Sequence, residues 1–120
     1  MESEKSIMNR CLVKLSTLPG VRVWRNNTGA LRDSNGQLVR FGLPGSGDII
    51  GLRSIVITPE MVGQTIGQFL AVETKRPGGK QTEQQEKFES MVVSLGGVYV
   101  LATNPDEAMA AFSKGDSHDK

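Results

Sequence analysis

The sequence predicts an α/β fold, a central mixed β-sheet flanked by helices, and three observations lead to this class. Helix-like and strand-like patterns of apolar residues alternate along the chain, several short strand patterns separate the first two helices, and residues 69–72 are all apolar. We expect one domain over 1–113, because 120 residues are enough for a single hydrophobic core. Residues 114–120 are expected to form a polar, disordered tail, whose His118 is neither a base nor a metal ligand.

The first expected element is a helix over residues 4–18. Apolar side chains recur there at helical spacing, Ser3 is suited to cap the first turn, and Pro19 and Gly20 are suited to end the helix. Cys11 belongs to the apolar stripe. Because a free cysteine usually packs as a small hydrophobic residue, we expect Cys11 to lie in the core.

Short strands are expected to follow this helix. Residues 21–25 alternate between apolar and polar, as a half-buried strand does. Residues 30–32 and 37–41 flank the turn sequence DSNG, which predicts a hairpin. The apolar residues at 48–52 predict another strand, and a further one is expected at 54–58.

The second half of the chain begins with a connection at 58–67 and a strong strand at 68–75. The apolar run inside that strand predicts burial on both faces, and therefore a central place in the sheet. The remaining elements are expected in this order: a loop at 76–81, a helix at 82–95 ended by two glycines, a strand at 98–102, and a short helix at 105–112 started by Asn104.

The composition indicates a folded protein without a membrane anchor. Apolar residues make up 38% and charged residues 22%, which is ordinary for a globular domain and too apolar for a disordered chain. No segment approaches the roughly 20 apolar residues that cross a bilayer, and the amino terminus is charged, unlike a signal sequence. We therefore expect a cytoplasmic protein.

The net charge of +1 conceals an uneven distribution. Residues 20–80 contain eight basic and four acidic side chains, which favours contact with a polyanion such as nucleic acid. A solvated basic face explains the same charges equally well. The candidates for phosphate contacts are Arg25, Arg53, Arg76 and Lys80.

Two acidic residues and a lysine stand out as a chemical site. Alternate side chains of a strand share a face, so Glu73 and Lys75 point the same way while Thr74 points the opposite way. An ionised pair at the end of an apolar strand is costly unless it has excellent partners or a function. Asp48 follows a loop rich in glycine and proline, in which Gly45 and Ser46 let a nucleic-acid backbone approach closely.

These residue types suit phosphodiester hydrolysis. The reaction needs a hard cation, an activated water and a positioned phosphate. The carboxylates of Asp48 and Glu73 are suitable ligands for Mg²⁺ or Mn²⁺, which bind oxygen donors. Lys75 is suited to orient the attacking water and to stabilise negative charge in the transition state.

The motif PGSGD, followed by ETK 25 residues after its aspartate, resembles the PD-(D/E)XK nuclease superfamily and, more narrowly, the virus-type replication-repair nuclease (VRR-NUC) domain. The likeness covers nearly the whole chain. It includes an opening helix with an acidic residue, RNNTG (25–29), PGSGDIIG (44–51), FLAVETKRPGGKQTEQQEKF (69–88) and the strand GGVYVLA.

The resemblance implies a role for each matching residue. Asp48 and Glu73 match the metal-binding acids, Lys75 matches the catalytic lysine, the backbone carbonyl of Thr74 matches a further metal ligand, and Gln85 matches the glutamine on the following helix. The acidic residue of the first helix is Glu2 or Glu4. Of these, Glu4 is better placed because it borders the apolar face of the helix.

The resemblance also implies an activity. It indicates a metal-dependent endonuclease that cuts DNA, with a preference for branched substrates such as four-way (Holliday) junctions. A homodimer is implied, because a two-fold axis places two active sites on opposing strands of a junction. The resemblance implies neither an organic cofactor nor a membrane. By analogy we expect a viral or prophage origin and action in the cytoplasm of a bacterial host. The alternatives are a catalytically silent binding module of the same fold, or a nuclease for other DNA or RNA substrates.

The site residues also have structural explanations. Glu4 favours the positive end of a helix dipole. Gln85 lies three residues after Thr82, as in a capping box, and this arrangement is compatible with a role in the site. Glu73 and Lys75 could form a structural salt bridge, and Asp48 could simply end a loop.

Overall fold

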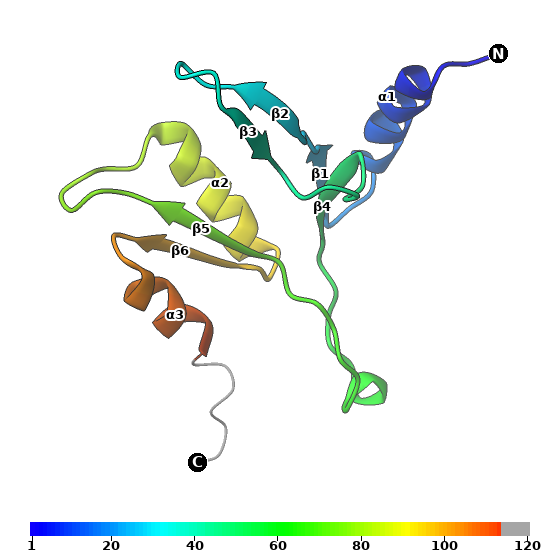
Figure 1. Cartoon of the computed structure of the whole chain (residues 1–120). Coiled ribbons are helices and arrows are strands. Elements are labelled where there is room, and N and C mark those ends of the chain that lie inside the picture. The colour runs from blue at the N-terminus through cyan, green and yellow to red at the C-terminus, as the bar shows by residue number, and fades with distance from the viewer. Residues whose placement is uncertain (114–120) are drawn as a thin grey trace. The chain divides into compact units, whose positions relative to one another are not determined.

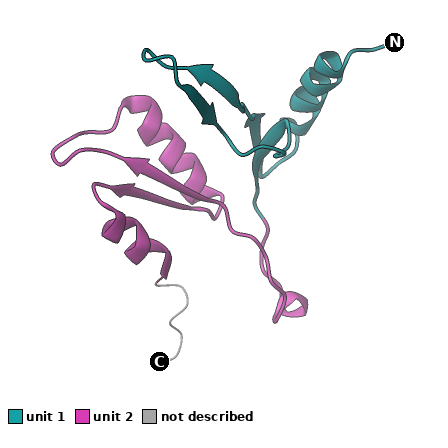
Figure 2. Ribbon diagram, in the orientation of Figure 1, with its two compact units in different colours: residues 1–54 teal, residues 55–120 magenta. Residues whose placement is uncertain are grey.

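The computed structural model describes residues 1–113 and divides into two compact units, Met1–Ser54 and Ile55–Lys120 (Figure 2). The predicted tail 114–120, with His118, lies outside the described residues. The elements of the first unit are α1 (Glu4–Leu15), β1 (Val21–Arg25), β2 (Gly29–Arg32), β3 (Leu38–Phe41) and β4 (Ile49–Arg53) (Figure 1). Those of the second are η1 (Pro59–Met61), β5 (Leu70–Thr74), α2 (Glu83–Ser94), β6 (Val98–Ala102) and α3 (Pro105–Ser113).

Helix α1 begins where the sequence predicts and ends earlier. The Ser3 hydroxyl accepts a hydrogen bond from the Ser6 N–H at 3.1 Å, which confirms the N-cap. The backbone leaves the α-helix after Leu15, because the N–H groups of Thr17 and Leu18 bond to carbonyls three residues back, in tighter turns. The prediction that Cys11 lies in the core is wrong, since this thiol is exposed on α1.

The predicted strand at 21–25 is confirmed, and the one at 48–52 is found as β4. β1 and β4 pair antiparallel with Val23 opposite Gly51. The two backbones approach so closely there that a Cβ added to Gly51 would lie 2.0 Å from the Arg22 carbonyl oxygen. Glycine is therefore a steric requirement at this position.

The predicted hairpin is also confirmed. β2 and β3 pair antiparallel from Gly29 opposite Phe41 to Arg32 opposite Leu38. The Asp33 carboxylate accepts hydrogen bonds from two backbone N–H groups of the turn, those of Asn35 and Gln37, at 2.9 Å each. This is the backbone mimicry that favours aspartate in turns.

The prediction of a strand at 54–58 is wrong. These residues form no helix or strand and lead into η1, which belongs to the expected connection. Val56 and Ile57 are 83% and 66% exposed. An apolar run gains strand structure only when its backbone finds a partner, and this run has none among the described residues.

In unit 2, β5 and β6 form a parallel pair joined by α2, and α2 and α3 lie on either side of the pair (Figure 1). Val92 of α2 is fully buried and Ala102 of β6 is 3% exposed, so these two residues belong to the core of this unit. The helix predicted at 82–95, the strand at 98–102 and the short closing helix are all confirmed. The Asn104 side chain accepts a hydrogen bond from the Glu107 N–H at 3.0 Å, as expected of the residue that starts α3.

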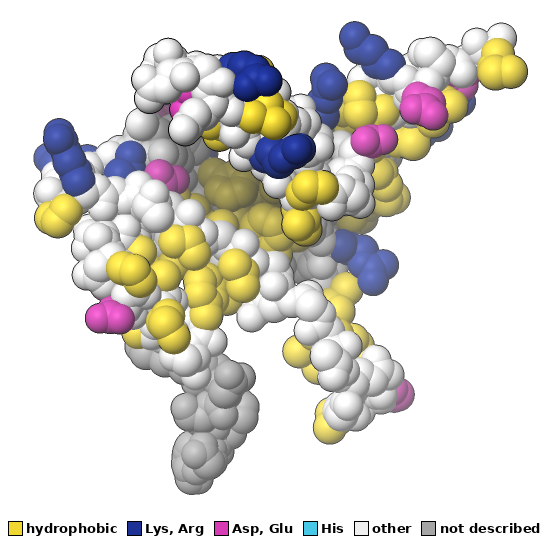
Figure 3. All heavy atoms as spheres, viewed as in Figure 1, with side chains coloured by type: hydrophobic (Ala, Val, Ile, Leu, Met, Phe, Trp, Pro, Cys, Tyr) yellow, Lys and Arg dark blue, Asp and Glu magenta, His cyan; other side chains and the backbone are white. Residues whose placement is uncertain are grey.

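The expectation that the apolar strand is central and buried on both faces is not met in unit 2. β5 has β6 as its strand partner, and Leu70 and Val72 are 55% and 41% exposed. Hydrophobic side chains gather on the surface over these strands (Figure 3). An apolar run is buried on both faces only when layers cover both, and periodicity does not reveal those layers.

The α/β class is confirmed by three helices and six strands among the described residues. The strands form three two-stranded sheets, two antiparallel and one parallel, where the sequence predicts one mixed sheet. Within residues 1–113, no helix is both long and apolar enough to span a lipid bilayer.

Candidate functional site

Glu73 and Lys75 lie on the same half-buried face of the β5 segment. The ladder with β6 continues beyond the strand, because the Lys75 N–H donates to the Ala102 carbonyl at 3.0 Å. The side chains of Glu73 and Lys75 are 22% and 20% exposed, and the Lys75 Nζ lies 3.9 Å from Oε2 of Glu73. This separation is too long for a hydrogen bond, so the two charges attract each other without a fixed contact.

Gln85 joins α2 to Glu73. Its Nε2 donates to Oε2 of Glu73 at 2.7 Å, and its Oε1 accepts from the Thr82 N–H at 2.9 Å. A backbone N–H can only donate, so the oxygen of the amide must face Thr82 and the nitrogen must face the carboxylate. The Thr82 hydroxyl completes the capping box by accepting from the Gln85 N–H. The capping role and the contact with Glu73 therefore coexist, as expected from the sequence.

Tyr99 contacts Glu73 from β6, and this contact is not predicted by the sequence analysis. The parallel register sets Tyr99 opposite Ala71, two residues before Glu73 on the same face. The Tyr99 hydroxyl donates to Oε1 of Glu73 at 3.2 Å. Burial raises the pKa of the Tyr99 phenol; the hydrogen bond from Gln81 opposes that rise, and the negative charge of Glu73 adds to it. The phenol thus keeps its proton at neutral pH.

The backbone of Thr74 presents its carbonyl at the open edge of β5. The peptide bond between Thr74 and Lys75 is trans, since the described residues contain no cis bond, and in a trans peptide C=O and N–H point in opposite directions. The Lys75 N–H points toward β6. The Thr74 carbonyl therefore points away from β6, toward an edge that carries no strand within unit 2.

An ordered turn follows Lys75. The Gly79 N–H donates to the Arg76 carbonyl at 2.9 Å, and Gly78 has φ of +83°. Proline and then glycine at the two central positions match a type II turn, which requires positive φ at the second of them. Arg76 and Lys80 flank this turn, and both side chains are exposed.

The Asp48 loop in unit 1 contains a turn of the same kind. The Ser46 N–H donates to the Leu43 carbonyl at 3.0 Å, and Gly45 has φ of +85°. Asn26 fixes the loop, because its Nδ2 donates to Ser46 Oγ at 2.7 Å and to the Gly47 carbonyl at 2.9 Å. The Asn26 N–H also donates to the Asp48 carbonyl at 2.8 Å. Asp48 itself is exposed.

Asn26 therefore positions the loop, a role that the sequence pattern does not predict. Its only signal was its place in the motif RNNTG.

The basic candidates of unit 1 lie at opposite ends of the β1–β4 ladder. Arg25 is opposite Ile49, next to Asp48, while Arg53 is at the far end of β4, ~16 Å from Asp48 along the strand. Both side chains are exposed.

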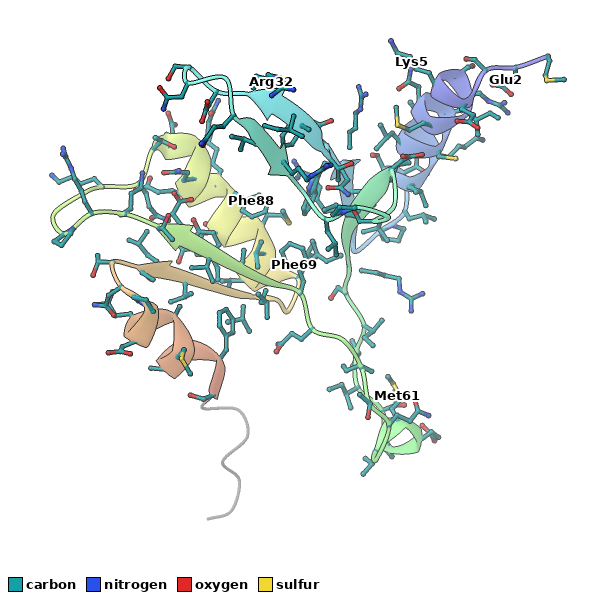
Figure 4. The ribbon with its side chains drawn as sticks, in the orientation of Figure 1. Glu2, Lys5, Arg32, Met61, Phe69 and Phe88 are labelled. Carbon is teal, nitrogen blue, oxygen red and sulfur yellow. The ribbon has the colours of Figure 1, made fainter. Side chains whose placement is uncertain are left out.

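The two candidate acids of the first helix have different surroundings. Glu2 forms an ion pair with Arg10 and accepts from the Ser6 hydroxyl at 2.8 Å, and these hydrogen bonds lower the pKa of Glu2. Glu4 is exposed in the first turn of α1, where a carboxylate is favoured by the helix dipole. Figure 4 labels Glu2 at this end of the chain.

The structure thus gathers Glu73, Lys75 and Gln85 in unit 2, and it gathers Asp48, Gly45 and Ser46 in the loop of unit 1. Across residues 1–113, no three side chains of the His, Cys, Asp or Glu type form a cluster able to hold a metal. Compared with known proteins, the chain matches no family model, no curated protein sequence and no solved structure.

Proposed function

We propose that the chain is a divalent-metal-dependent endonuclease that hydrolyses phosphodiester bonds in DNA. The observation that carries the proposal is the arrangement around Glu73, with Lys75 at 3.9 Å and Gln85 at 2.7 Å on one half-buried face. A purely structural salt bridge would gain most by closing to hydrogen-bond distance. Because Lys75 lies near Glu73 without a hydrogen bond to it, its ammonium group remains available to a ligand.

The donor set fits Mg²⁺ or Mn²⁺. Glu73 has two carboxylate oxygens with about four acceptor positions, and Gln85 and Tyr99 occupy one on each oxygen. The Thr74 carbonyl at the open strand edge is a further oxygen donor of the type that these cations prefer. In the proposal, Asp48 is the second acidic ligand and Glu4, or else Glu2, assists from the first helix. The cation would supply charge neutralisation at the scissile phosphate and lower the pKa of a bound water.

The other residues act on the substrate and the water. Lys75 holds the attacking water in place and stabilises negative charge as the phosphate is attacked. Gln85 keeps the Glu73 carboxylate in one orientation. Arg76 and Lys80, exposed on either side of the turn after Lys75, contact the DNA phosphates, and Arg25, Gly45 and Ser46 do so beside Asp48. Arg53 is the weakest of these candidates because it lies at the far end of β4.

The proposal extends to substrate and assembly through the VRR-NUC resemblance. The preferred substrate is branched DNA such as a four-way junction, and the active form is a homodimer with two-fold symmetry. Sedimentation of the purified protein should give the mass of two chains of 13.0 kDa.

A gel assay of cleavage tests the proposed function. Single-stranded, duplex, flapped and four-way DNA are each incubated with the protein in Mg²⁺, Mn²⁺ or EDTA. The proposal predicts cleavage with either cation, most on four-way DNA, and none in EDTA. DNA binding without cleavage in any of these conditions would contradict it and would identify a catalytically silent binding module instead. Parallel RNA versions of the substrates show whether the sugar matters.

A further inference from the structure

The Glu73 carboxylate is held from two sides. Gln85 donates to Oε2 from α2, and Tyr99 donates to Oε1 from β6. Two hydrogen bonds from different elements fix both the position and the rotation of a carboxylate, which one bond cannot do. Gln85 already has a place in the proposed function, whereas Tyr99 has none.

The hydrogen bonds around Tyr99 have a defined direction. Gln81 Nε2 lies 3.1 Å from Oε1 of Glu89 and 3.3 Å from the Tyr99 hydroxyl. A carboxylate only accepts, so the nitrogen of the Gln81 amide must face Glu89, and its second hydrogen is directed at Tyr99. The Tyr99 oxygen therefore accepts from Gln81, and its single hydrogen is left for Glu73.

The ring of Tyr99 is supported separately from its hydroxyl. It packs edge-on against Phe88, with ring centroids 6.3 Å apart and planes at 62°. This packing holds the ring without any need for the hydroxyl. The hydroxyl itself makes two contacts, at 3.2 Å to Glu73 and 3.3 Å to Gln81.

We infer that Tyr99 is a positioning residue that orients the Glu73 carboxylate toward a divalent cation, and that Gln81 in turn orients Tyr99. The inference rests on the proposed function, because it assumes that Glu73 holds a metal. It goes beyond that function by adding two residues to the support of the site.

The test measures Mn²⁺ binding to the full-length protein without DNA, by electron paramagnetic resonance. Tyr99→Phe removes the hydroxyl and keeps the ring, and it should weaken Mn²⁺ binding by about 10-fold, as the loss of a hydrogen bond to a metal ligand does. Gln81→Met should weaken binding less, because Tyr99 keeps its bond to Glu73. Cleavage by Tyr99→Phe should need correspondingly more Mn²⁺ and should recover when the cation saturates.

Val92→Ala is the matched control for a loss of stability. Val92 is fully buried on α2 and contacts no metal candidate through a hydrogen bond, so this variant should melt at a lower temperature and bind Mn²⁺ with wild-type affinity. The inference is overturned if Tyr99→Phe binds Mn²⁺ as tightly as the wild type, or if Val92→Ala weakens binding equally. If Tyr99→Phe weakens Mn²⁺ binding as expected but the wild type cuts no DNA, the proposed nuclease function is contradicted and this inference still holds.

Discussion

Lys75 lies beside the Glu73 carboxylate but forms no hydrogen bond with it. Its Nζ is 3.9 Å from Oε2 of Glu73, which is too far for a hydrogen bond, and its side chain is 20% exposed. An anion that binds beside such an ammonium group is stabilised by charge-assisted hydrogen bonds. In the proposed reaction the anion is the scissile phosphate with its attacking water.

The first prediction concerns this lysine. Lys75→Ala should lower the cleavage rate by about 100-fold or more, since removing one donor to transition-state charge has effects of that size. DNA binding and melting temperature should change little. Lys87→Ala is the control, because Lys87 is 75% exposed on α2 and outside the site. Equal cleavage by the two variants would remove Lys75 from the catalytic assignment.

The second prediction separates the two roles of Gln85. Thr82→Ala removes only the cap, and it should lower the free energy of unfolding by about 1 kcal/mol while cleavage stays normal. Gln85→Ala should destabilise to a similar extent and, because it also releases Glu73, should slow cleavage about 10-fold. Urea unfolding and initial cleavage rates measure the two effects. If both variants cut alike, the glutamine is only a cap.

At the scale of single residues, the sequence reveals the parts of the site that depend on local geometry. Glu73 and Lys75 share a face because strand side chains alternate, and Gln85 is marked by its spacing from Thr82. Tyr99 escapes this reasoning because its contact depends on the register between β5 and β6. Asn26 escapes it as well, since the loop that it fixes lies 20 residues further along the chain.

Among the elements, the β1–β4 pair depends on one glycine. Gly51→Ala would bring a Cβ to 2.0 Å from the Arg22 carbonyl, so the strands must separate. We predict a loss of about 2–3 kcal/mol in the free energy of unfolding, the usual cost of forcing atoms into a packed contact. Gly67→Ala is the control, because a Cβ there meets nothing within 4 Å. Equal stability of both variants in urea would contradict the observed strand register.

The stability of the fold should depend on pH through Glu107, at the start of α3. The Thr103 N–H and hydroxyl donate to Glu107, and the backbone bond is the main cause of the lowered pKa of this carboxyl. A lowered folded-state pKa means that the charged form stabilises the fold above the ordinary glutamate pKa, and that this contribution is lost as pH falls through the folded-state value. Glu107→Gln should therefore melt below the wild type at pH 7, with the difference shrinking at pH 3. A difference that grows on acidification would contradict this sign.

The boundaries of most elements also follow from local signals. Caps and turn residues mark the starts of the helices and the hairpin at sites that the structure confirms. The strand expected at 54–58 fails because a strand needs a partner, and no feature within those five residues supplies one. The expected burial of Leu70 and Val72 fails for a related reason. An apolar run in a sequence does not reveal which helices or strands will cover its two faces.

For the whole molecule, the central proposal is that the carboxylates of Asp48 and Glu73 are both needed to bind a divalent cation. Asp48 follows one proline–glycine turn in unit 1, and Glu73 precedes another in unit 2. The α/β class can be predicted from the alternation of helix and strand patterns. The pairing of the strands cannot, because it depends on contacts between residues far apart in the sequence.

The most direct test of this claim is a titration of Mn²⁺ into the wild type, Asp48→Asn and Glu73→Gln, followed by electron paramagnetic resonance without DNA. Asp106→Asn, an acid in the first turn of α3, is the control. We predict that the wild type and the control bind Mn²⁺ alike and that Asp48→Asn and Glu73→Gln each weaken this binding at least about 10-fold. Wild-type affinity in either of those two variants would contradict the account.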